Sequence, residues 1–174
     1  MKNDKPLVGI SRCLLGDAVR YDGGSKANQV VLEELSQYFE FIPVCPEVEA
    51  GLSVPRPAVQ LTGSISKPKV TGRDQPSLDV SDIMQAYCHS KPAQLKLLHG
   101  FIFKSRSPSC GLNSTPVFID GEMVTETGRG VFAKKFCEVY PQLAVIEDTQ
   151  LENKELLNEF IRAVKIARLK HQQA

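Results

Sequence analysis

The chain has 174 residues, a net charge of +1, and 42% apolar and 24% charged residues. This composition excludes a disordered chain. Acidic residues balance the basic ones, so the chain lacks the excess of positive charge typical of nucleic-acid-binding proteins. The length favours a single domain over residues 1–174. Residues 1–6 contain no signal-peptide core, and no stretch approaches the roughly 20 apolar residues of a membrane helix. We therefore expect a cytoplasmic protein whose five cysteines stay reduced.

The first half of the chain alternates between β-like apolar runs and helical spacing. Residues 7–11 and 41–44 are predicted strands, and residues 14–24 are predicted to form a loop after the first of them. A helix is expected from about 27 to 38, since Val30, Val31, Leu35 and Tyr38 recur at helical spacing. The segment 54–76 is rich in Pro and Gly and holds two short β-like runs. It is expected to form a hairpin or an ordered flap.

The second half continues the alternation. A helix is predicted from about 80 to 98 with a break at Pro92, followed by a strand at 100–105. Asp120-Gly121 signals a hairpin between 115–119 and 123–125. A helix from the Gly128-Arg-Gly130 turn to Tyr140, a strand at 143–146 and a helix from 151 to about 170 complete the chain. This order predicts an α/β fold with a mostly parallel sheet flanked by helices, a Rossmann-like three-layer arrangement.

Three of the five cysteines stand at or just after the ends of predicted strands. Cys13, Cys45 and Cys110 each follow such a run. Because the carboxyl ends of parallel strands share one edge of the sheet, three thiols there predict a common metal centre. Cys88 and Cys137 instead lie in helical windows beside apolar residues. We expect these two to be buried as small hydrophobic side chains.

The chemistry of three thiolates favours zinc or an iron–sulfur cluster over magnesium or calcium. The spacing is not a CxxC signature, so spacing alone leaves the metal undecided. His89, His99 and His171 lie in helical or terminal segments and are poor candidates for a fourth ligand. A structural zinc site wants four protein ligands, whereas a cubane cluster held by three cysteines leaves one iron open. The count of ligands therefore favours a catalytic centre.

The motifs around these cysteines resemble the thiouracil desulfurase family, formerly a domain of unknown function. The matching blocks run through the first two thirds of the chain: Ser11-Arg-Cys-Leu-Leu-Gly16, Arg20-Tyr-Asp-Gly-Gly24, Pro43-Val-Cys-Pro-Glu-Val-Glu-Ala-Gly-Leu52, Pro55-Arg-Pro57 and Lys104-Ser-Arg-Ser-Pro-Ser-Cys-Gly111. Some relatives carry a second, C-terminal domain. This chain ends after its last predicted helix and so resembles the stand-alone, single-domain form.

The resemblance implies a [4Fe-4S] cluster bound by Cys13, Cys45 and Cys110, with the fourth iron open to a sulfur atom. It also implies an enzyme that converts thiouracil to uracil and sulfide without net redox change. The expected partner is a small thiolated base, and the near-neutral charge argues against nucleic acid. Relatives acting on other thiolated bases or nucleosides would share the same motifs.

Hydrolysis of a carbon–sulfur bond needs an acid or base beside the metal. Glu47, two residues after Cys45, is the first candidate, and Asp22 in the Arg-Tyr-Asp-Gly-Gly loop is the second. Asp22 could equally be a turn carboxylate that bonds its own backbone. Among the serines near Cys110, Ser107 is preferred to Ser105 and Ser109 for hydrogen bonding to substrate or cluster.

The sequence leaves two interpretations open for several other charged residues. The four arginines of the matched blocks could hold a substrate oxygen, but more often such residues tie strand ends together: Arg12, Arg20, Arg56 and Arg106. Glu49 could be a second acid or an ion-pair partner. The helix after Gly130 could attract an anionic or carbonyl group at its N-terminus. For the whole protein, the alternatives are a non-catalytic sulfide or metal carrier and a zinc-stabilised domain that binds a modified RNA.

Overall fold

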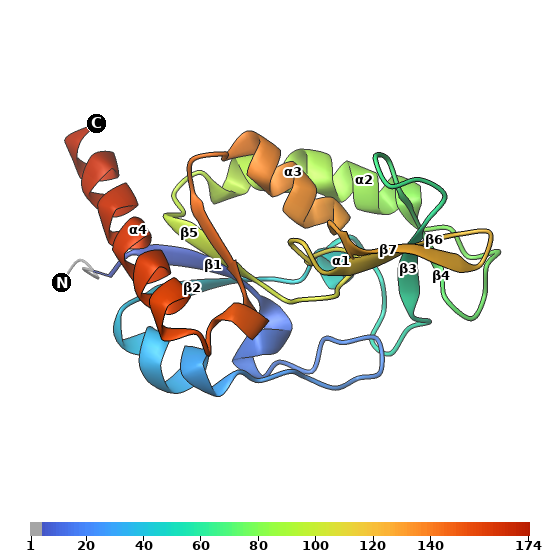
Figure 1. Cartoon of the computed structure of the whole chain (residues 1–174), viewed down its shortest axis with the longest axis horizontal. Coiled ribbons are helices and arrows are strands. Elements are labelled where there is room, and N and C mark those ends of the chain that lie inside the picture. Colours follow the sequence, from blue (N-terminus) through green and yellow to red (C-terminus); the bar gives the residue numbers. More distant parts are fainter. Residues whose placement is uncertain (1–4) are drawn as a thin grey trace.

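A four-stranded parallel sheet forms the centre of the computed structural model, which describes residues 5–174 (Figure 1). Residues 1–4, part of the segment without a signal-peptide core, lie outside the described residues. The strands are β1 (Leu7–Ser11), β2 (Glu40–Val44), β5 (Gly100–Phe103) and β8 (Ala144–Glu147), in the order β2-β1-β5-β8. Val8 pairs with Phe41 on one side and with Gly100 on the other. The mostly parallel sheet predicted from the alternating pattern is confirmed.

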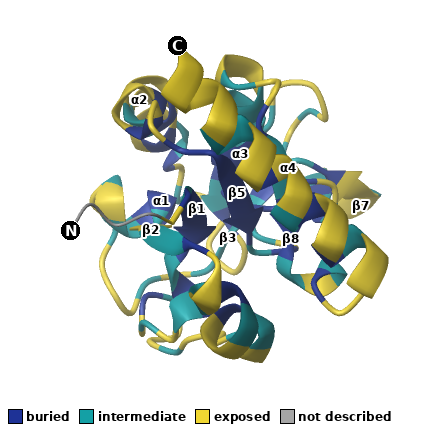
Figure 2. Ribbon diagram, turned by 90° about the vertical axis from the view of Figure 1, so that its left-hand side faces the viewer, coloured by how far each residue is buried: buried dark blue, intermediate teal, exposed yellow. Residues whose placement is uncertain are grey.

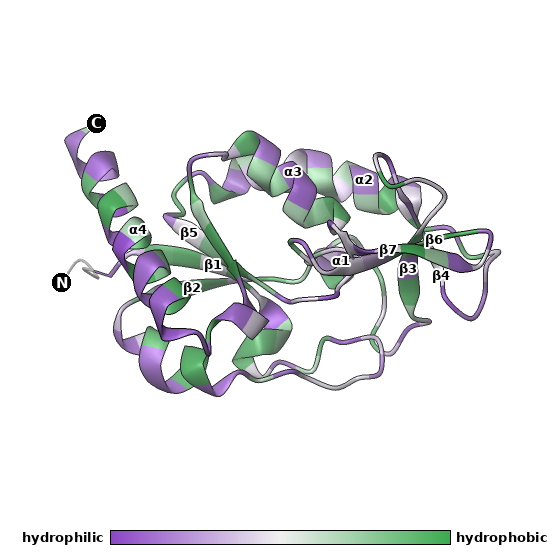
Figure 3. Cartoon of the chain, viewed as in Figure 1, coloured by the Kyte–Doolittle hydropathy of each residue, from purple (hydrophilic) through white to green (hydrophobic). Residues whose placement is uncertain are grey.

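Helical segments cover both faces of this sheet (Figure 1). One face carries η2 (Val30–Glu34), η3 (Leu35–Gln37) and α4 (Lys154–Gln173), and the other carries α2 (Ser81–Ser90), η4 (Lys91–Leu95) and α3 (Val131–Val139). Parallel strands covered on both sides are expected to be apolar throughout. Figure 2 shows β1 and β5 buried at the centre, and Figure 3 shows their apolar character. The three-layer arrangement is therefore confirmed.

The two faces of the sheet bury separate apolar clusters. Val8, Ile10 and Ile102 pack toward η2 and α4, whereas Phe101 and Phe103 pack with the aromatic side chains of α3. Gly9 in β1 makes this second cluster possible. A Cβ atom at Gly9 would lie 2.3 Å from a ring carbon of Phe101, so only glycine lets the ring lie against the strand.

A second, mixed sheet stands beside the first (Figure 1). It contains β3 (Val59–Thr62), β4 (Lys69–Gly72), β6 (Thr115–Ile119) and β7 (Glu122–Gly128), in the order β4-β3-β6-β7. The β6–β7 pair is the antiparallel hairpin that the Asp120-Gly121 signal predicted, and the antiparallel β3–β4 pair realises the first of the two alternatives, hairpin or ordered flap, expected for residues 54–76. Their union through a parallel β3–β6 contact was not predicted. That pairing joins Leu61 to Val117, residues from distant parts of the sequence for which no local signal exists.

Two helices differ in detail from the sequence-based expectation. The segment expected to be helical from 27 to 38 forms a wide π-helical turn followed by a 3₁₀ turn, and it begins beside Asn28, whose Oδ1 accepts from the Val31 N–H. Val31 and Leu35 are buried as expected, but Tyr38 is exposed. The last helix begins at Lys154 rather than 151, because Asn153 caps it by accepting from the N–H groups of the second and third helical residues.

Three short helical turns follow strands of the parallel sheet at its carboxyl edge. They are η1 (Arg12–Leu15) after β1, α1 (Pro46–Glu49) after β2, and η5 (Asp148–Gln150) after β8. This edge collects most of the residues that the sequence singled out. Among residues 5–174, no helix combines the length and apolar character that a membrane span needs.

Candidate active site

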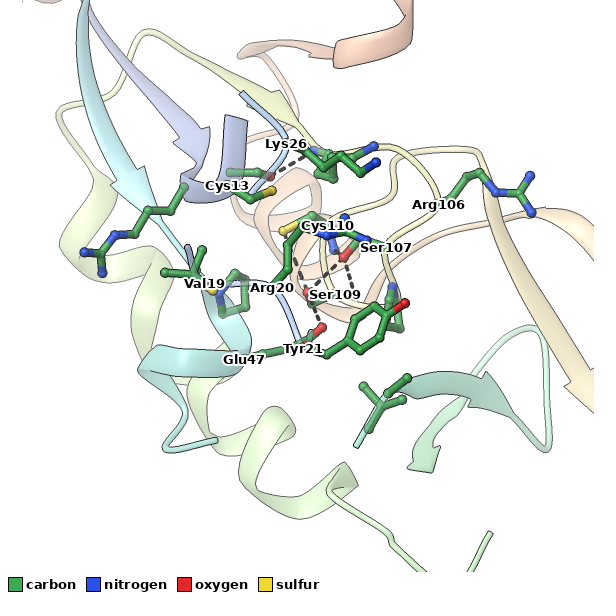
Figure 4. Close-up of a pocket in the computed structure, with 18 of the residues that line it drawn as sticks. Cys13, Val19, Arg20, Tyr21, Lys26, Glu47, Arg106, Ser107, Ser109 and Cys110 are labelled. Carbon is green, nitrogen blue, oxygen red and sulfur yellow. Dashed lines mark hydrogen bonds between the residues drawn. The ribbon is translucent and has the colours of Figure 1, made fainter. Parts of the chain in front are cut away.

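Cys13, Cys45 and Cys110 line one pocket at the carboxyl edge of the parallel sheet. Cys13 follows β1, Cys45 follows β2, and Cys110 lies in the loop after β5. The pocket has a volume of about 490 Å³, within the range of small-molecule sites. Figure 4 shows the sulfur atoms of Cys13 and Cys110 pointing toward one another. The structure thus brings together the three thiols that the sequence placed at strand ends, and it does so beside β1, where the strand order reverses.

Burial dominates the ionisation of these thiols. It raises the pKa of Cys13 to about 11, although Lys104 and Arg20 act in the opposite direction. Burial also raises the pKa of Cys45 and of Cys110, whose sulfur is the most deeply enclosed of the three. Binding of a metal group would therefore displace protons from these sulfurs and supply the positive charge that thiolates need. Within residues 5–174, no three Cys, His, Asp or Glu side chains converge on the position of a single metal ion.

Two carboxylates at the end of β8, Glu147 and Asp148, hold the ends of the loop that carries Cys110. Asp148 accepts from the Ser105 N–H at 2.7 Å and from Lys104 Nζ at 3.0 Å. Glu147 Oε1 accepts from the Leu112 N–H at 2.6 Å and from the next two residues. The loop leaves β5 at one carboxylate and reaches β6 beyond the other. Its conformation therefore depends on residues that lie about 40 positions further along the chain.

The N-terminus of α3 holds the same loop through backbone hydrogen bonds. The N–H groups of Val131 and Phe132 donate to the carbonyl oxygens of Pro108 and Ser109, and the Gly130 N–H donates to the Gly111 carbonyl. The first N–H groups of a helix have no partner within the helix, so the loop carbonyls satisfy them. The sequence allowed an anionic or carbonyl group at this helix N-terminus, and the groups that lie there are backbone carbonyls of the Cys110 loop.

Gly130 approaches the Cys110 loop too closely to tolerate a side chain. In Gly130→Ala the new Cβ would lie 2.5 Å from the Ser109 carbonyl carbon and 2.7 Å from the Cys110 nitrogen. We expect a displaced loop, a loss of about 1–3 kcal/mol in the free energy of unfolding, and faster alkylation of Cys110. Urea titration and mass spectrometry of the alkylated protein measure both effects.

Gly121→Ala is the matched control for that substitution. Gly121 lies in the β6–β7 turn with φ +80° and has no neighbouring heavy atom within 4 Å of the added Cβ. The strain at positive φ costs about 1–2 kcal/mol, but the turn does not touch the cysteines. Alkylation of Cys110 should stay slow in this variant. Equal labelling of Cys110 in the two variants would contradict the close-contact explanation.

Glu47 lies at the second position of α1 and faces the pocket (Figure 4). Its Oε2 accepts from Arg56 Nε at 2.8 Å and from Arg56 Nη2 at 2.7 Å, in a pair whose side chains are only 12% and 6% exposed. The other oxygen, Oε1, accepts from Ser109 Oγ at 3.3 Å. Arg56 thus fixes one oxygen of the carboxylate and leaves the other directed at the Cys110 loop.

The three serines around Cys110 have different surroundings. Ser107 Oγ accepts from the Cys110 N–H at 3.0 Å and lies 3.1 Å from Ser109 Oγ. Ser109 Oγ also lies 3.8 Å from the sulfur of Cys110. Ser105 is taken up by the Asp148 clamp and by Lys104. Ser109 Oγ therefore lies between the Cys110 sulfur and Glu47, and Ser107 Oγ extends this hydroxyl chain to the Cys110 backbone (Figure 4).

Asp22 does not reach the cysteines. It is about half exposed, does not line the pocket, and accepts from the Gly24 N–H at 2.9 Å. This hydrogen bond lowers the pKa of its carboxyl group. The geometry is that of the turn carboxylate which the sequence allowed as the alternative.

All four arginines of the motif blocks line the pocket, but their side chains have different partners. Arg56 and Arg12 tie loops together, Arg56 through Glu47 and the Val19 carbonyl and Arg12 through Asp17 at 2.6 Å. Arg106 is exposed with φ 61°, and its side chain extends away from the cysteines (Figure 4). The Arg20 guanidinium group lies over the ring of Tyr21.

Sequence reasoning missed several residues that line the pocket. They are Tyr21, Lys26, Arg73 and Lys104. Tyr21 and Lys104 occur inside the quoted motifs, so the motifs themselves were a usable signal. Arg73 directly follows β4, and its guanidinium group lies 5.6 Å from the centre of the Tyr21 ring. No local pattern announces this contact, because it depends on how the second sheet meets the first.

The remaining cysteines and the histidines lie elsewhere. Cys88 is buried in the core under α2, where burial raises its pKa to about 12, and Cys137 is partly buried on α3. Both agree with the expectation of packed thiols. His99 and His171 place their rings 4.9 Å apart near the opposite end of β1, where the Leu7 N–H bonds His99 Nδ1. None of the three histidines lines the pocket.

The chain is similar to known proteins, some of which have a described activity. A family model described as 2-thiouracil desulfurase matches residues 8–148. A solved structure described as the [4Fe-4S]-dependent thiouracil desulfidase TudS is similar with a TM-score of 0.66 and 28% identity, over 89% of this chain and 99% of that one. The uncharacterized protein YbbK of Bacillus subtilis (strain 168) is 26% identical over 111 residues, which cover 60% of this chain and 73% of YbbK.

The matches and the fold agree on the class of the protein, which is a desulfurase, an enzyme that breaks carbon–sulfur bonds. More narrowly, the chain belongs to the 2-thiouracil desulfurase family. The family resemblance drawn from the cysteine motifs is therefore confirmed. The matched segment contains all three pocket cysteines and ends at Asp148, so it includes both carboxylates that clamp the Cys110 loop.

Proposed function

We propose that this chain, acting as a single domain, hydrolyses a thiolated pyrimidine at an iron–sulfur cluster. Cys13, Cys45 and Cys110 would hold a [4Fe-4S] cluster, and one iron would have no protein ligand. The observation that carries the proposal is the presence of all three thiols in one pocket at the carboxyl edge of the parallel sheet. The similar TudS structure, described as [4Fe-4S]-dependent, supports the same cofactor.

The donor set of the pocket fits such a cluster. Its cysteines are soft ligands of the kind that bind iron–sulfur clusters, and no histidine lines the pocket. A fourth thiol is also missing from the lining, since Cys88 and Cys137 belong to the core beneath α2 and α3. Lys104 and Arg20 act on Cys13, and Arg56 acts on Cys45, each in the direction that favours the thiolate. These cations would offset part of the negative charge of a bound cluster.

The reaction adds water to a thiocarbonyl carbon and releases hydrosulfide, so no electron is gained or lost. When bound, the cluster would supply a Lewis-acidic iron for the substrate sulfur. Glu47 is the base that takes a proton from the attacking water, through the Oε1 atom that Arg56 leaves uncommitted. Arg56 positions this carboxylate and does not itself need to touch the substrate.

Ser109 and Ser107 would carry the proton toward the leaving sulfur. Ser109 Oγ is within hydrogen-bond distance of Glu47 Oε1, and Ser107 Oγ lies 3.1 Å from Ser109 Oγ. Both hydroxyl groups can donate and accept, so a proton received by Glu47 can reach the side of the pocket where Cys110 lies. This arrangement supports a proton relay formed by Ser107 and Ser109 together. Glu47 is the group that changes charge when it takes up and releases the proton.

Anaerobic reconstitution with iron and sulfide is the direct test of the proposed function. We expect a brown protein with about four irons per chain that releases sulfide from 2-thiouracil and forms uracil. Iron and sulfide analysis, absorption spectra and chromatography of the product measure the three results. A stable cluster without turnover would favour a sulfide carrier. A protein that binds only zinc under strict anaerobic conditions would contradict the iron–sulfur mechanism.

A further inference from the structure

The side chain of Glu49 turns back onto the backbone of Cys45. Glu49 is the last residue of α1, and its Oε2 accepts from the Cys45 N–H at 2.8 Å. The same oxygen accepts from the Tyr87 hydroxyl of α2 at 3.1 Å. Lys91 Nζ lies 2.7 Å from the other oxygen, Oε1. One carboxylate thus links the backbone of a pocket cysteine to two side chains from a helical segment about 40 residues away.

We propose that Glu49, held by Lys91 and Tyr87, is a positioning residue that fixes Cys45 as a cluster ligand and sets the charge beside that iron. The proposal rests on the function proposed above, because it needs Cys45 to be a ligand. Glu49 does not line the pocket and would not touch the substrate. It acts through Cys45.

The geometry explains why the Cys45 turn needs such a residue. Cys45 is the N-cap residue of α1, and its side chain lines the pocket. Pro46 follows it and has no N–H group to donate. The carboxylate of Glu49 reaches back to the Cys45 N–H as the acidic residue of a capping box does, one position later than usual. The turn is therefore fixed by a side chain that is itself anchored by Tyr87 and Lys91.

The ion pair also has an electrostatic consequence. The Lys91 side chain is 14% exposed and that of Glu49 is 30% exposed, so solvent screens this pair only in part. When both residues are present, the negative charge of Glu49 and the positive charge of Lys91 largely cancel in their effect on a bound cluster. Hydrogen bonds and net charge around a cluster set its reduction potential. Glu49 also occupies the Cys45 N–H, which is then not free to bond a cluster sulfur.

Charge-neutral variants of the two partners test the proposal on the reconstituted protein. Glu49→Gln leaves the positive charge of Lys91 unpaired, and we expect the midpoint potential of the cluster to rise. Lys91→Met leaves the negative charge of Glu49 unpaired, and we expect the potential to fall. The double variant should return close to the wild-type value. Redox titration followed by electron paramagnetic resonance measures all three shifts.

A matched ion pair that does not line the pocket provides the control. Lys154 and Glu34 lie 3.3 Å apart on the surface, and neither lines the pocket. Glu34→Gln and Lys154→Met make the same changes of charge and should leave the midpoint potential unchanged. Shifts of equal size in this pair would mean that the effect is a general one of net charge, and this outcome would overturn the proposal.

A second measurement uses the protein without a cluster. In Glu49→Ala the Cys45 turn loses its anchor, so alkylation of Cys45 should become several-fold faster while alkylation of Cys13 stays unchanged. Peptide mass spectrometry separates the two cysteines. Wild-type labelling together with wild-type potentials would overturn the proposal. A wild-type protein that takes up no cluster would instead overturn the proposed function. Reconstitution of the wild-type protein alone gives this result, so the two failures can be told apart.

Discussion

Replacing Cys110 with alanine is expected to abolish cluster binding and sulfide release together. The Cys110 thiol is buried, its loop is clamped at both ends, and no other cysteine lines the pocket near it apart from Cys13 and Cys45. Two thiolates would remain, too few to hold the cluster with a single open iron. Iron analysis and the visible spectrum after anaerobic reconstitution measure the first loss, and sulfide release from 2-thiouracil measures the second.

Cys137→Ala is the control for the loss of a thiol. Cys137 lies on α3, is partly buried and does not line the pocket. We expect this variant to keep the wild-type content of iron and the wild-type rate, with at most a modest loss of stability. A Cys110→Ala protein that still holds about four irons would contradict the assignment of this ligand.

Glu47→Gln is expected to lower the rate of sulfide release by about 10²–10⁴ while the cluster stays in place, because the amide cannot take the proton from water. The amide keeps the size of the side chain and can still accept from Arg56. It leaves the guanidinium charge buried without a counter-charge, which costs up to about 3–5 kcal/mol of folding free energy. The rate should therefore be compared at a temperature where both proteins are folded. Single-turnover assays and thermal unfolding separate the two effects.

Asp22→Asn tests the other carboxylate that the sequence proposed. Asp22 is exposed and bonds the backbone of its own turn, so its replacement should change the rate little. The asparagine can still accept from the Gly24 N–H and preserve the turn. A large loss of rate in Asp22→Asn with a normal rate in Glu47→Gln would reverse the roles proposed for the two residues.

The sequence predicted the gathering of the cysteines because the rule behind it is topological. Parallel strands end at one edge, so Cys13 and Cys45, which directly follow strands, had to be neighbours once the sheet was parallel. The hairpin at Asp120-Gly121 was equally predictable, since the turn signal is local. The hairpin needs only the residues of its turn, and the gathering of the cysteines needs only the alternation of strands and helices that makes the sheet parallel.

Other parts of the site depend on contacts between distant segments. Glu49 was left between an acid and an ion-pair partner, and its partner Lys91 is 42 residues away. Arg73 reaches the pocket only because β3 pairs with β6, which joins the two hairpins into a second sheet. Periodicity carries no information about which distant charges meet. The departure from a regular helix around Val30 and Val31 is of the same kind, since apolar spacing predicts burial better than the width of a helical turn.

The clamp on the Cys110 loop has a consequence for how the protein is made. The loop is held by N–H groups of residues 130–133 and by the carboxylates of Glu147 and Asp148, all of which are synthesised after it. A nascent chain that has just left the ribosome up to Cys110 carries all three thiols but has no means of fixing the third. Acquisition of the cluster is therefore expected to follow the completion of β8, so that the cofactor is loaded into a nearly finished sheet and does not serve as the template around which the sheet folds.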